Sequence, residues 1–224
     1  MNAAHRIGLL GGTFDPIHFG HLDAAEAART ALGLNEVRLV PSFDPPHRSG
    51  DPVATSFHRF ALVALAIADR PAYRVSDTEL RRAGPSYTAD TLRALRAEGW
   101  RPLQLFFVLG ADAFAEIATW HEFPDVLDGA HFVVIARPGT TLEDAAARTA
   151  GLRGRMHSAG DHIPDDGGTR IILVPARTRN ISSTMIRARL AARQPIDDLV
   201  PAAVARHIAV HQLYRAVGDL HGKD

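Results

Sequence analysis

Residues 7–21 constrain the fold of this chain more than any other segment. Residues 7–10 form a short apolar run that ends at Gly11 and Gly12, and an Ala- and Glu-rich stretch of helical character follows Pro16. This order predicts a strand, a glycine turn and a helix. Glycines let backbone N–H groups approach a phosphate, and the following helix directs its positive N-terminal end to the same place. The segment therefore predicts a site for several phosphates.

Two histidines stand at the start of the predicted helix. His18 and His21 are three residues apart, so their rings should lie on one face of the helix, with the side-chain-free Gly20 between them. The segment lacks the Gly-x-Gly-x-x-Gly spacing of a dinucleotide site and the Gly-Lys-Ser/Thr of a P-loop. Because glycine-rich first turns are common in doubly wound folds, the glycines alone do not identify the site.

The remainder of the chain alternates between predicted helices and strands, which is the pattern of an α/β protein with a Rossmann-like, doubly wound parallel sheet. The nearly continuous apolar run over 103–109 predicts a central strand buried on both faces. Residues 1–224 are predicted as a single domain, with a mobile loop over 151–169 and a frayed tail over 216–224. The other predicted strands cover 37–40, 73–80, 131–136 and 171–174, and the predicted helices cover 22–34, 55–69, a segment opened by Ser86 as N-cap, 113–118, 142–150 and about 183–193.

Charge and composition exclude several classes of function. Twenty-five basic residues balance twenty-five acidic ones, so no bulk field attracts nucleic acid or a membrane surface. Without cysteine the chain has no disulfide, thiolate metal site or cysteine nucleophile. The sequence contains no signal-peptide pattern and no run of about 18 apolar residues, so we expect a cytoplasmic protein.

The histidine segment and a second one near the C-terminus resemble a known superfamily. His18-Phe19-Gly20-His21 matches the His-x-Gly-His signature of nucleotidyltransferases, and residues 11–21 resemble the longer form found in bacterial nicotinate-nucleotide adenylyltransferases. Residues 181–187, Ile-Ser-Ser-Thr-Met-Ile-Arg, resemble the second signature of the superfamily. Hydroxyl residues at a helix start, followed by an arginine, also suit an anion by their own chemistry. Further resemblances, in the order of the family, are Pro45-Pro46-His47-Arg48, the Ser-Tyr-Thr-x-Asp-Thr-Leu of residues 86–92, Gly110-Ala111-Asp112 with Trp120, and Arg137-Pro138-Gly139.

The resemblance implies a reaction and a set of site residues. ATP and nicotinate mononucleotide would give nicotinate adenine dinucleotide and pyrophosphate in NAD biosynthesis, with Mg²⁺ held largely by phosphates and water and by no residue of the chain. The implied catalytic residues are His18, His21 and Arg187. The implied ATP-binding residues are Gly11, Gly12, Thr13, Phe14, His18, Gly20, His21, Gly110, Asp112, Ile181, Ser182, Ser183 and Arg187. The implied residues for the mononucleotide are Ser42, His47, Arg48, Tyr87, Thr88, Trp120, His121 and Arg137.

Three alternatives stay open at the level of sequence. An adenylyltransferase could prefer nicotinamide mononucleotide, and another nucleotidyltransferase could act on an acceptor such as phosphopantetheine. The latter would lack the segment at residues 86–92 and Trp120. A non-catalytic nucleotide-binding sensor would need damaged phosphate residues, whereas His18, His21, Ser183 and Arg187 are all present. A monomer and a homo-oligomer are equally compatible with the sequence.

Overall fold

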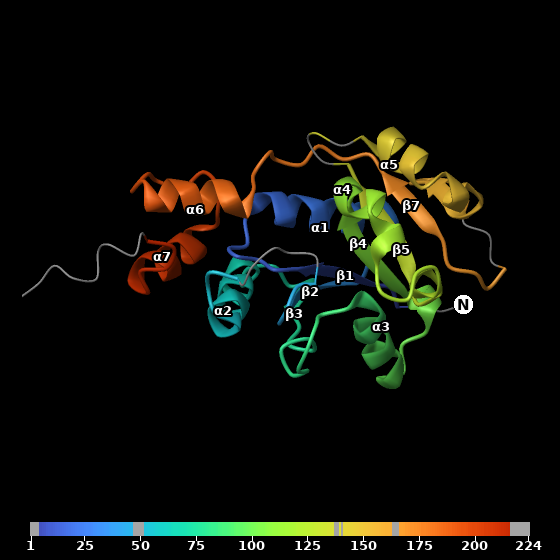
Figure 1. Cartoon of the computed structure of the whole chain (residues 1–224), viewed down its shortest axis with the longest axis horizontal. Coiled ribbons are helices and arrows are strands. Elements are labelled where there is room, and N and C mark those ends of the chain that lie inside the picture. Colours follow the sequence, from blue (N-terminus) through green and yellow to red (C-terminus); the bar gives the residue numbers. More distant parts are fainter. Residues whose placement is uncertain (1–4, 47–51, 137–138, 140, 163–165, 216–224) are drawn as a thin grey trace, which may run out of the picture.

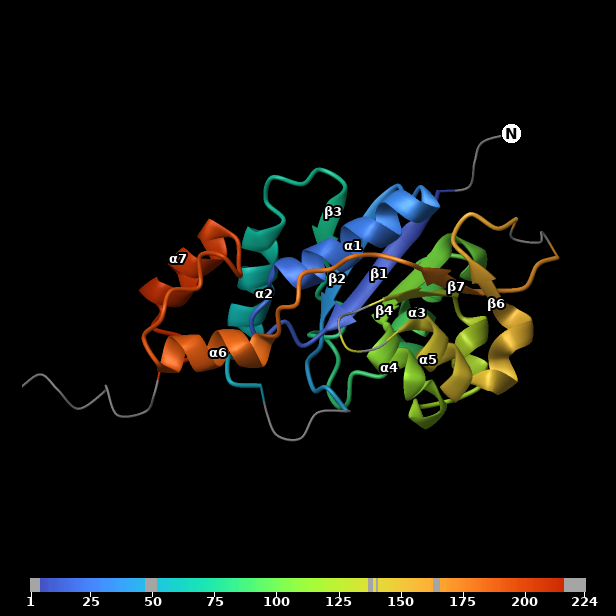
Figure 2. The same cartoon turned by 90° about the horizontal axis from the view of Figure 1, so that it is seen from above.

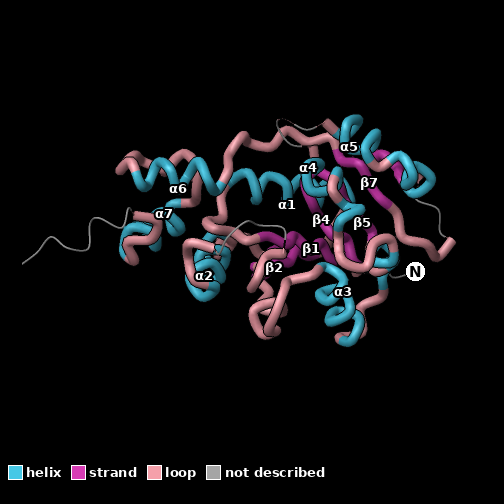
Figure 3. Tube along the Cα trace, viewed as in Figure 1, coloured by secondary structure: helices cyan, strands magenta, loops and turns pink. Residues whose placement is uncertain are grey.

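Seven parallel strands form one sheet at the centre of the protein, and helices lie around it (Figures 1 and 3). The computed structural model describes residues 5–46, 52–136, 139, 141–162 and 166–215. The strand order is β3-β2-β1-β4-β5-β7-β6, and every pairing is parallel. The strands are β1 (Ile7–Gly12), β2 (Glu36–Pro41), β3 (Tyr73–Val75), β4 (Leu105–Gly110), β5 (His131–Ile135), β6 (Met156–Ser158) and β7 (Ile171–Val174).

The helices fall into those that cover the sheet and those that extend beyond it. Figure 2 shows α6 and α7 together beside α2, at one end of the molecule. None of the helices in the described ranges is long and apolar enough to cross a membrane. The α-helices are α1 (Phe19–Leu32), α2 (Ser56–Ala66), α3 (Thr88–Ala97), α4 (Ala111–Ala115), α5 (Leu142–Arg148), α6 (Ser183–Ala191) and α7 (Ala202–Val210), and the 3-10 helices are η1 (Pro102–Gln104), η2 (Ile117–Thr119), η3 (Asp125–Asp128) and η4 (Ala150–Arg155).

The two faces of the sheet bury two separate sets of side chains. Along β4, Phe106 and Val108 enter one apolar core, whereas Leu105, Phe107 and Leu109 enter the other, because successive side chains of a strand point to opposite faces. The first core includes side chains of α1 and α2, and the second includes side chains of α3, α4 and α5. Figure 1 shows α1 and α3 on opposite sides of the sheet. The predicted central strand, buried on both faces, is therefore confirmed.

The direction of winding changes between β1 and β4, which lie side by side. From β1 the chain proceeds outward through β2 to β3. From β4 it proceeds through β5 to β6 at the other edge and then returns to β7, which lies between β5 and β6. The predicted Rossmann-like doubly wound parallel sheet is confirmed. Ligands of such sheets bind outside the carboxyl ends of the strands at this switch point. Gly12 and Gly110 are the last residues of β1 and β4, so they mark where a site is expected.

The first strand runs further than predicted. β1 continues through Gly11 and Gly12, and Gly12 pairs with Pro41 of β2, so the turn does not begin at the glycines. The residue in the left-handed region is Phe14, with φ of 49°. This conformation costs a non-glycine residue about 1–2 kcal/mol. Packing compensates for it, since the Phe14 side chain is fully buried in the core.

Two predictions at the edges of the sheet are wrong. The strand expected over 73–80 ends at Val75, because Ser76 and Thr78 bond to each other and start a turn. The loop expected over 151–169 begins instead with η4 and with β6, which pairs with β7. A three-residue edge strand with polar side chains gives no apolar alternation to detect. Residues 163–165 of that loop and the predicted tail over 216–224 lie outside the described residues.

Candidate active site

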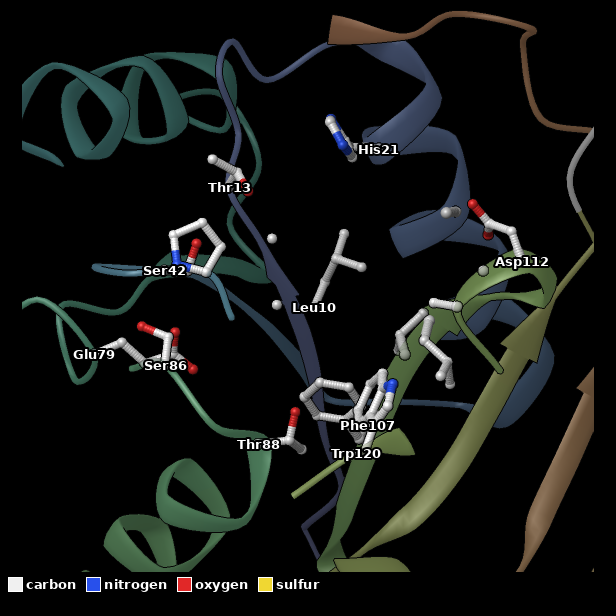
Figure 4. A pocket seen from close by; sticks show the side chains of 18 of the residues that line it. Leu10, Thr13, His21, Ser42, Glu79, Ser86, Thr88, Phe107, Asp112 and Trp120 are labelled. Carbon is white, nitrogen blue, oxygen red and sulfur yellow. The ribbon is translucent and has the colours of Figure 1, made fainter. Parts of the chain in front are cut away.

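A cavity of about 450 Å³ opens at the switch point, between the carboxyl ends of β1 and β4 (Figure 4). Its floor is formed by the last residues of these two strands, and its sides by the start of α1, the segment after β2, the start of α3 and the segment after β4. It brings together many of the predicted site residues, namely Gly11, Gly12, Thr13, Gly20, His21, Ser42, Thr88, Gly110, Asp112 and Trp120.

His21 projects from the first turn of α1 toward this space (Figure 4). Its Nδ1 accepts a hydrogen bond from the backbone N–H of His18 at 3.3 Å. In the neutral ring the proton therefore sits on Nε2, which makes that nitrogen a donor. The ring stacks on His18 with 3.7 Å between centroids and meets the edge of Phe14 at 5.1 Å. These contacts fix the direction of the donor before any ligand binds.

His18 stands at the start of α1, as predicted, but is more deeply buried than His21. It is the N-cap of α1, its side chain is only 1% exposed, and its ring lies against that of His21. The two rings do share one face, as predicted. Gly20 allows this arrangement, since an added Cβ would come within 3.1 Å of the His18 ring and 3.2 Å of the Arg179 carbonyl. His21 thus lines the cavity, while His18 lies beneath it.

A second cavity, of about 240 Å³, adjoins the first and shares Thr13 and His21 with it. The Arg187 guanidinium lines this cavity, and its Nη1 donates to the backbone carbonyl of Asp15 at 2.7 Å. The Ser183 hydroxyl donates to the carbonyl of Pro16 at 2.9 Å. Hence the two signature segments, far apart in the sequence, are joined by hydrogen bonds. Asp15 and Thr184 also line this cavity. We call five of its lining residues, Thr13, Phe14, His21, Ser183 and Arg187, the phosphate end.

The residues at the start of α6 have three different roles: one caps the helix, one packs in the core, and two line the second cavity. The Ser182 hydroxyl accepts from the backbone N–H of Met185 at 3.1 Å and so caps the helix. The Ile181 side chain is buried in the core, which leaves only its backbone for a ligand. Ser183 and Thr184 line the second cavity. The N-terminal end of α6 therefore faces this cavity with its N–H groups and its dipole.

The start of α3 forms the opposite end of the site. A small extension of about 60 Å³ shares Pro46, Ser86, Thr88 and Trp120 with the main cavity. Ser86 is not the N-cap that was predicted, because its hydroxyl accepts from the backbone N–H groups of Phe43 and Asp44 at 2.9 and 3.3 Å. The N-cap is Tyr87, and among the described residues its side chain makes no capping hydrogen bond.

Aromatic rings and one hydroxyl complete this end. Trp120 meets the edge of Phe107 at 5.9 Å, and Tyr87 stacks on His121 at 4.2 Å. Ser42 lines the cavity, and within the described part of the chain its buried hydroxyl makes no hydrogen bond. We call the residues of this side, namely Ser42, Ser86, Tyr87, Thr88, Trp120 and His121, the acceptor end.

Comparison with known proteins assigns the family. The Cytidylyltransferase-like family matches residues 9–189 of the chain. A protein named "Probable nicotinate-nucleotide adenylyltransferase" from Symbiobacterium thermophilum is 42% identical over 219 residues, which cover 97% of this chain and 98% of that protein. One of the same name from Pseudomonas syringae pv. tomato is 44% identical and covers 94% of both chains. The chain belongs to the nicotinate-nucleotide adenylyltransferase family.

The fold is also that of solved adenylyltransferases. The protein is similar to Plasmodium falciparum nicotinic acid mononucleotide adenylyltransferase complexed with APC, with a TM-score of 0.69 and 17% identity. The superposed residues cover 94% of this chain and 97% of the Plasmodium chain. The same enzyme complexed with NaAD gives the same TM-score with 18% identity. These structures confirm the predicted fold, while the sequence relatives confirm the predicted family and enzyme class.

A buried carboxyl group in the wall of the main cavity was not predicted from the sequence. Glu79 lines the main cavity with only 6% of its surface exposed, and the Thr91 hydroxyl donates to it at 2.6 Å. Burial raises the pKa of Glu79 above its usual value, against the opposing effect of that hydrogen bond. Glu79 falls within the segment wrongly predicted as a strand, so no local pattern marks it.

Three predicted site residues, His47, Arg48 and Arg137, lie outside the described residues. Their roles stay predictions from the resemblance.

Proposed function

We propose that the protein catalyses attack of the 5′-phosphate of nicotinate mononucleotide on the α-phosphorus of ATP. A new phosphorus–oxygen bond forms, the bond between the α-phosphorus and the bridging oxygen breaks, and pyrophosphate leaves with that electron pair. The product, nicotinate adenine dinucleotide, serves NAD biosynthesis. The observation that carries the proposal is that adjoining cavities, which share lining residues, run from an anion-binding end to an aromatic end beside a helix N-terminus.

The phosphate end suits a triphosphate. His21 would donate from Nε2 to the α-phosphate, where negative charge develops in the transition state. The N–H groups at the start of α6, which begins at Ser183, would hold the β- and γ-phosphates that leave, together with the Arg187 guanidinium. A phosphate oxygen is already a nucleophile, so catalysis would depend on positioning and charge stabilisation, without a general base. His18 would act through the ring of His21 that it supports.

The acceptor end suits an aromatic acid. The N–H groups of the first turn of α3, beginning at Thr88, and the positive end of its dipole would bind the carboxylate of the nicotinate ring. Trp120 would contact the ring through its indole face, and the Ser42 hydroxyl, which makes no hydrogen bond within the described residues, would donate to an acceptor oxygen of the mononucleotide.

A divalent cation would enter with ATP. Among the described residues, no group of three or more His, Asp or Glu side chains could hold a metal ion. Mg²⁺ fits this donor set, because it keeps several waters and binds phosphate oxygens readily. When bound, the cation neutralises charge on the phosphates that leave. We also propose that the enzyme works in the cytoplasm and, because the charge of the chain is balanced, that it has no nucleic acid or membrane partners.

The test is pyrophosphate release from ATP and Mg²⁺ with nicotinate mononucleotide, nicotinamide mononucleotide or phosphopantetheine as acceptor. We expect turnover with the nicotinate form and the formation of nicotinate adenine dinucleotide. Release only with phosphopantetheine, or nucleotide binding without turnover, would contradict the proposal.

A further inference from the structure

Arg59, in the first half of α2, is a charged side chain buried behind the wall of the active site. Only 1% of its surface is exposed. A charge buried in this way is costly unless hydrogen bonds compensate for it. Here the guanidinium donates to four backbone carbonyls, those of Thr13 at 2.8 Å, Ser42 at 2.7 Å, Ala54 at 3.2 Å and Phe43 at 3.4 Å. These carbonyls belong to three segments, around residues 13, 42–43 and 54, which Arg59 joins through one side chain.

The first of these contacts fixes the phosphate end. The carbonyl of Thr13 belongs to the same peptide plane as the N–H of Phe14, and in a trans peptide the two point in opposite directions. Because Arg59 holds the carbonyl, the Phe14 N–H is directed away from Arg59. Thr13 and Phe14 both line the second cavity. Arg59 therefore sets a backbone donor in the segment proposed to meet the triphosphate.

The contacts with Ser42 and Phe43 fix the acceptor end in the same manner. Their carbonyls accept from Arg59, and the N–H groups that follow, those of Phe43 and Asp44, donate to the Ser86 hydroxyl. Arg59 and Ser86 thus hold the same two peptides from opposite sides. Ser86 lies two residues before the start of α3 and lines the cavity. The connection from Arg59 reaches the site of the mononucleotide.

We propose that Arg59 is a positioning residue for adenylyl transfer, which sets the distance and orientation between the phosphate end and the acceptor end. This inference rests on the proposed function. In-line attack needs the two phosphates in register, and a misplacement of about 1 Å can cost about 100-fold in rate. The Thr13 and Ser42 carbonyls both accept from Nη1, while Nε and Nη2 bind those of Ala54 and Phe43. A lysine would keep the charge but lose the planar fork, so one nitrogen cannot bind all four carbonyls in the present geometry.

The experiment compares Arg59→Lys with wild type by steady-state kinetics, at a temperature where circular dichroism shows both fully folded. Each end keeps its own binding groups, so we expect kcat to fall about 10- to 100-fold while the KM of each substrate changes less than about threefold. The matched control is Arg155→Lys, because Arg155 also joins segments, through the Leu127 carbonyl and the Thr169 hydroxyl, just before β5 and β7 begin. This control should keep the kcat of wild type.

Several outcomes would overturn the inference. These are an unchanged kcat in Arg59→Lys, a loss equal to that of Arg155→Lys, or a rise in both KM values without a loss of kcat. If Arg59→Lys fails to fold, Ser86→Ala breaks the same connection at its other end and must show the same loss confined to kcat. Wild-type turnover is measured first: its absence contradicts the proposed function, whereas normal wild-type turnover with an unaffected Arg59→Lys contradicts only the role of Arg59.

Discussion

The phosphate end and the acceptor end of the site differ in how their polar groups are used. At the phosphate end, Arg187 and Ser183 already donate to the carbonyls of Asp15 and Pro16, and His21 already accepts from the backbone of His18. At the acceptor end, the Ser86 hydroxyl accepts from the backbone of Phe43 and Asp44, but within the described residues the Ser42 hydroxyl makes no hydrogen bond and the Tyr87 side chain caps no N–H group of α3. The comparison indicates that the phosphate end supplies fixed charge stabilisation, while the acceptor end selects the substrate.

The largest expected effect is at the phosphate end. His21→Ala should lower kcat by about 10²- to 10³-fold, because it removes one preorganised donor to the developing charge. Thermal unfolding should change little, since His21 lines the cavity and its ring is not part of the apolar core. His157→Ala, on the edge strand β6, is the matched control. A variant with near-normal kcat would refute the catalytic role, and one that does not fold would show that His21 is structural.

The acceptor end should distinguish a carboxylate from a carboxamide. Both oxygens of nicotinate can accept from N–H groups, whereas the amide presents a donor to a donor. A charge-assisted hydrogen bond is about twice as strong as a neutral one, and a mispaired buried donor costs about 1–3 kcal/mol. We therefore expect kcat/KM to favour nicotinate mononucleotide by about 100-fold. The measurement uses both mononucleotides at identical ATP and Mg²⁺, and equal values would show that α3 does not form a carboxylate site.

A smaller effect is expected from Arg187→Lys. The charge stays, but the fork that reaches both the Asp15 carbonyl and the cavity is lost. The kcat/KM for ATP should fall about tenfold, equivalent to about 1.4 kcal/mol, with little change in the KM of the mononucleotide. Arg189→Lys, in the same helix but bonded to Asp198, is the control. An unchanged kcat/KM for ATP would remove Arg187 from the phosphate end.

The smallest effect on catalysis is expected from a change at His131. This residue begins β5, so it lies at the amino ends of the strands, away from the phosphate and acceptor ends of the site. Burial lowers its pKa to about 4, and its Nδ1 accepts from the backbone N–H of Arg170. The unfolded chain, with a pKa near 6.5, binds the proton more readily. The free energy of unfolding should therefore be constant above about pH 6.5 and fall by about 3 kcal/mol between about pH 6.5 and pH 4.

The His131→Asn variant should lose most of this pH dependence and keep its kcat at neutral pH. Urea unfolding at a series of pH values measures the difference. The same slope in wild type and variant would show that another group carries the acid sensitivity.

The two ends also differ in how far they could be predicted. The phosphate end comes from two contiguous segments, so its residues appear in the sequence as motifs. The acceptor end combines segments after β2, before α3 and after β4, and its detailed contacts arise only on folding. Ser86 shows this: its sequence position predicts a helix cap, but the nearby backbone of Phe43 and Asp44 takes its hydroxyl instead. Glu79 and Arg59 carry no local signal, because only tertiary burial distinguishes them from surface charges.

The fold was predictable where apolar periodicity is strong. The central strands and the helices that cover them have buried faces that impose a period on the sequence. The predictions are wrong at β3 and β6, where short strands at the sheet edges are specified by pairing with β2 and β7 rather than by their own side chains. They are also wrong at Gly12, where pairing with β2 extends a strand that the glycines were expected to end.

The hydrogen bonds from Arg187 and Ser183 to the turn after β1 have a thermodynamic consequence. They order residues 15 and 16 when the chain folds, so the conformational entropy of that turn is lost during folding and not when ATP arrives. Binding of the nucleotide then reduces mainly the freedom of the ligand itself. The enthalpy of the new phosphate contacts is therefore retained as affinity instead of being spent on ordering the protein.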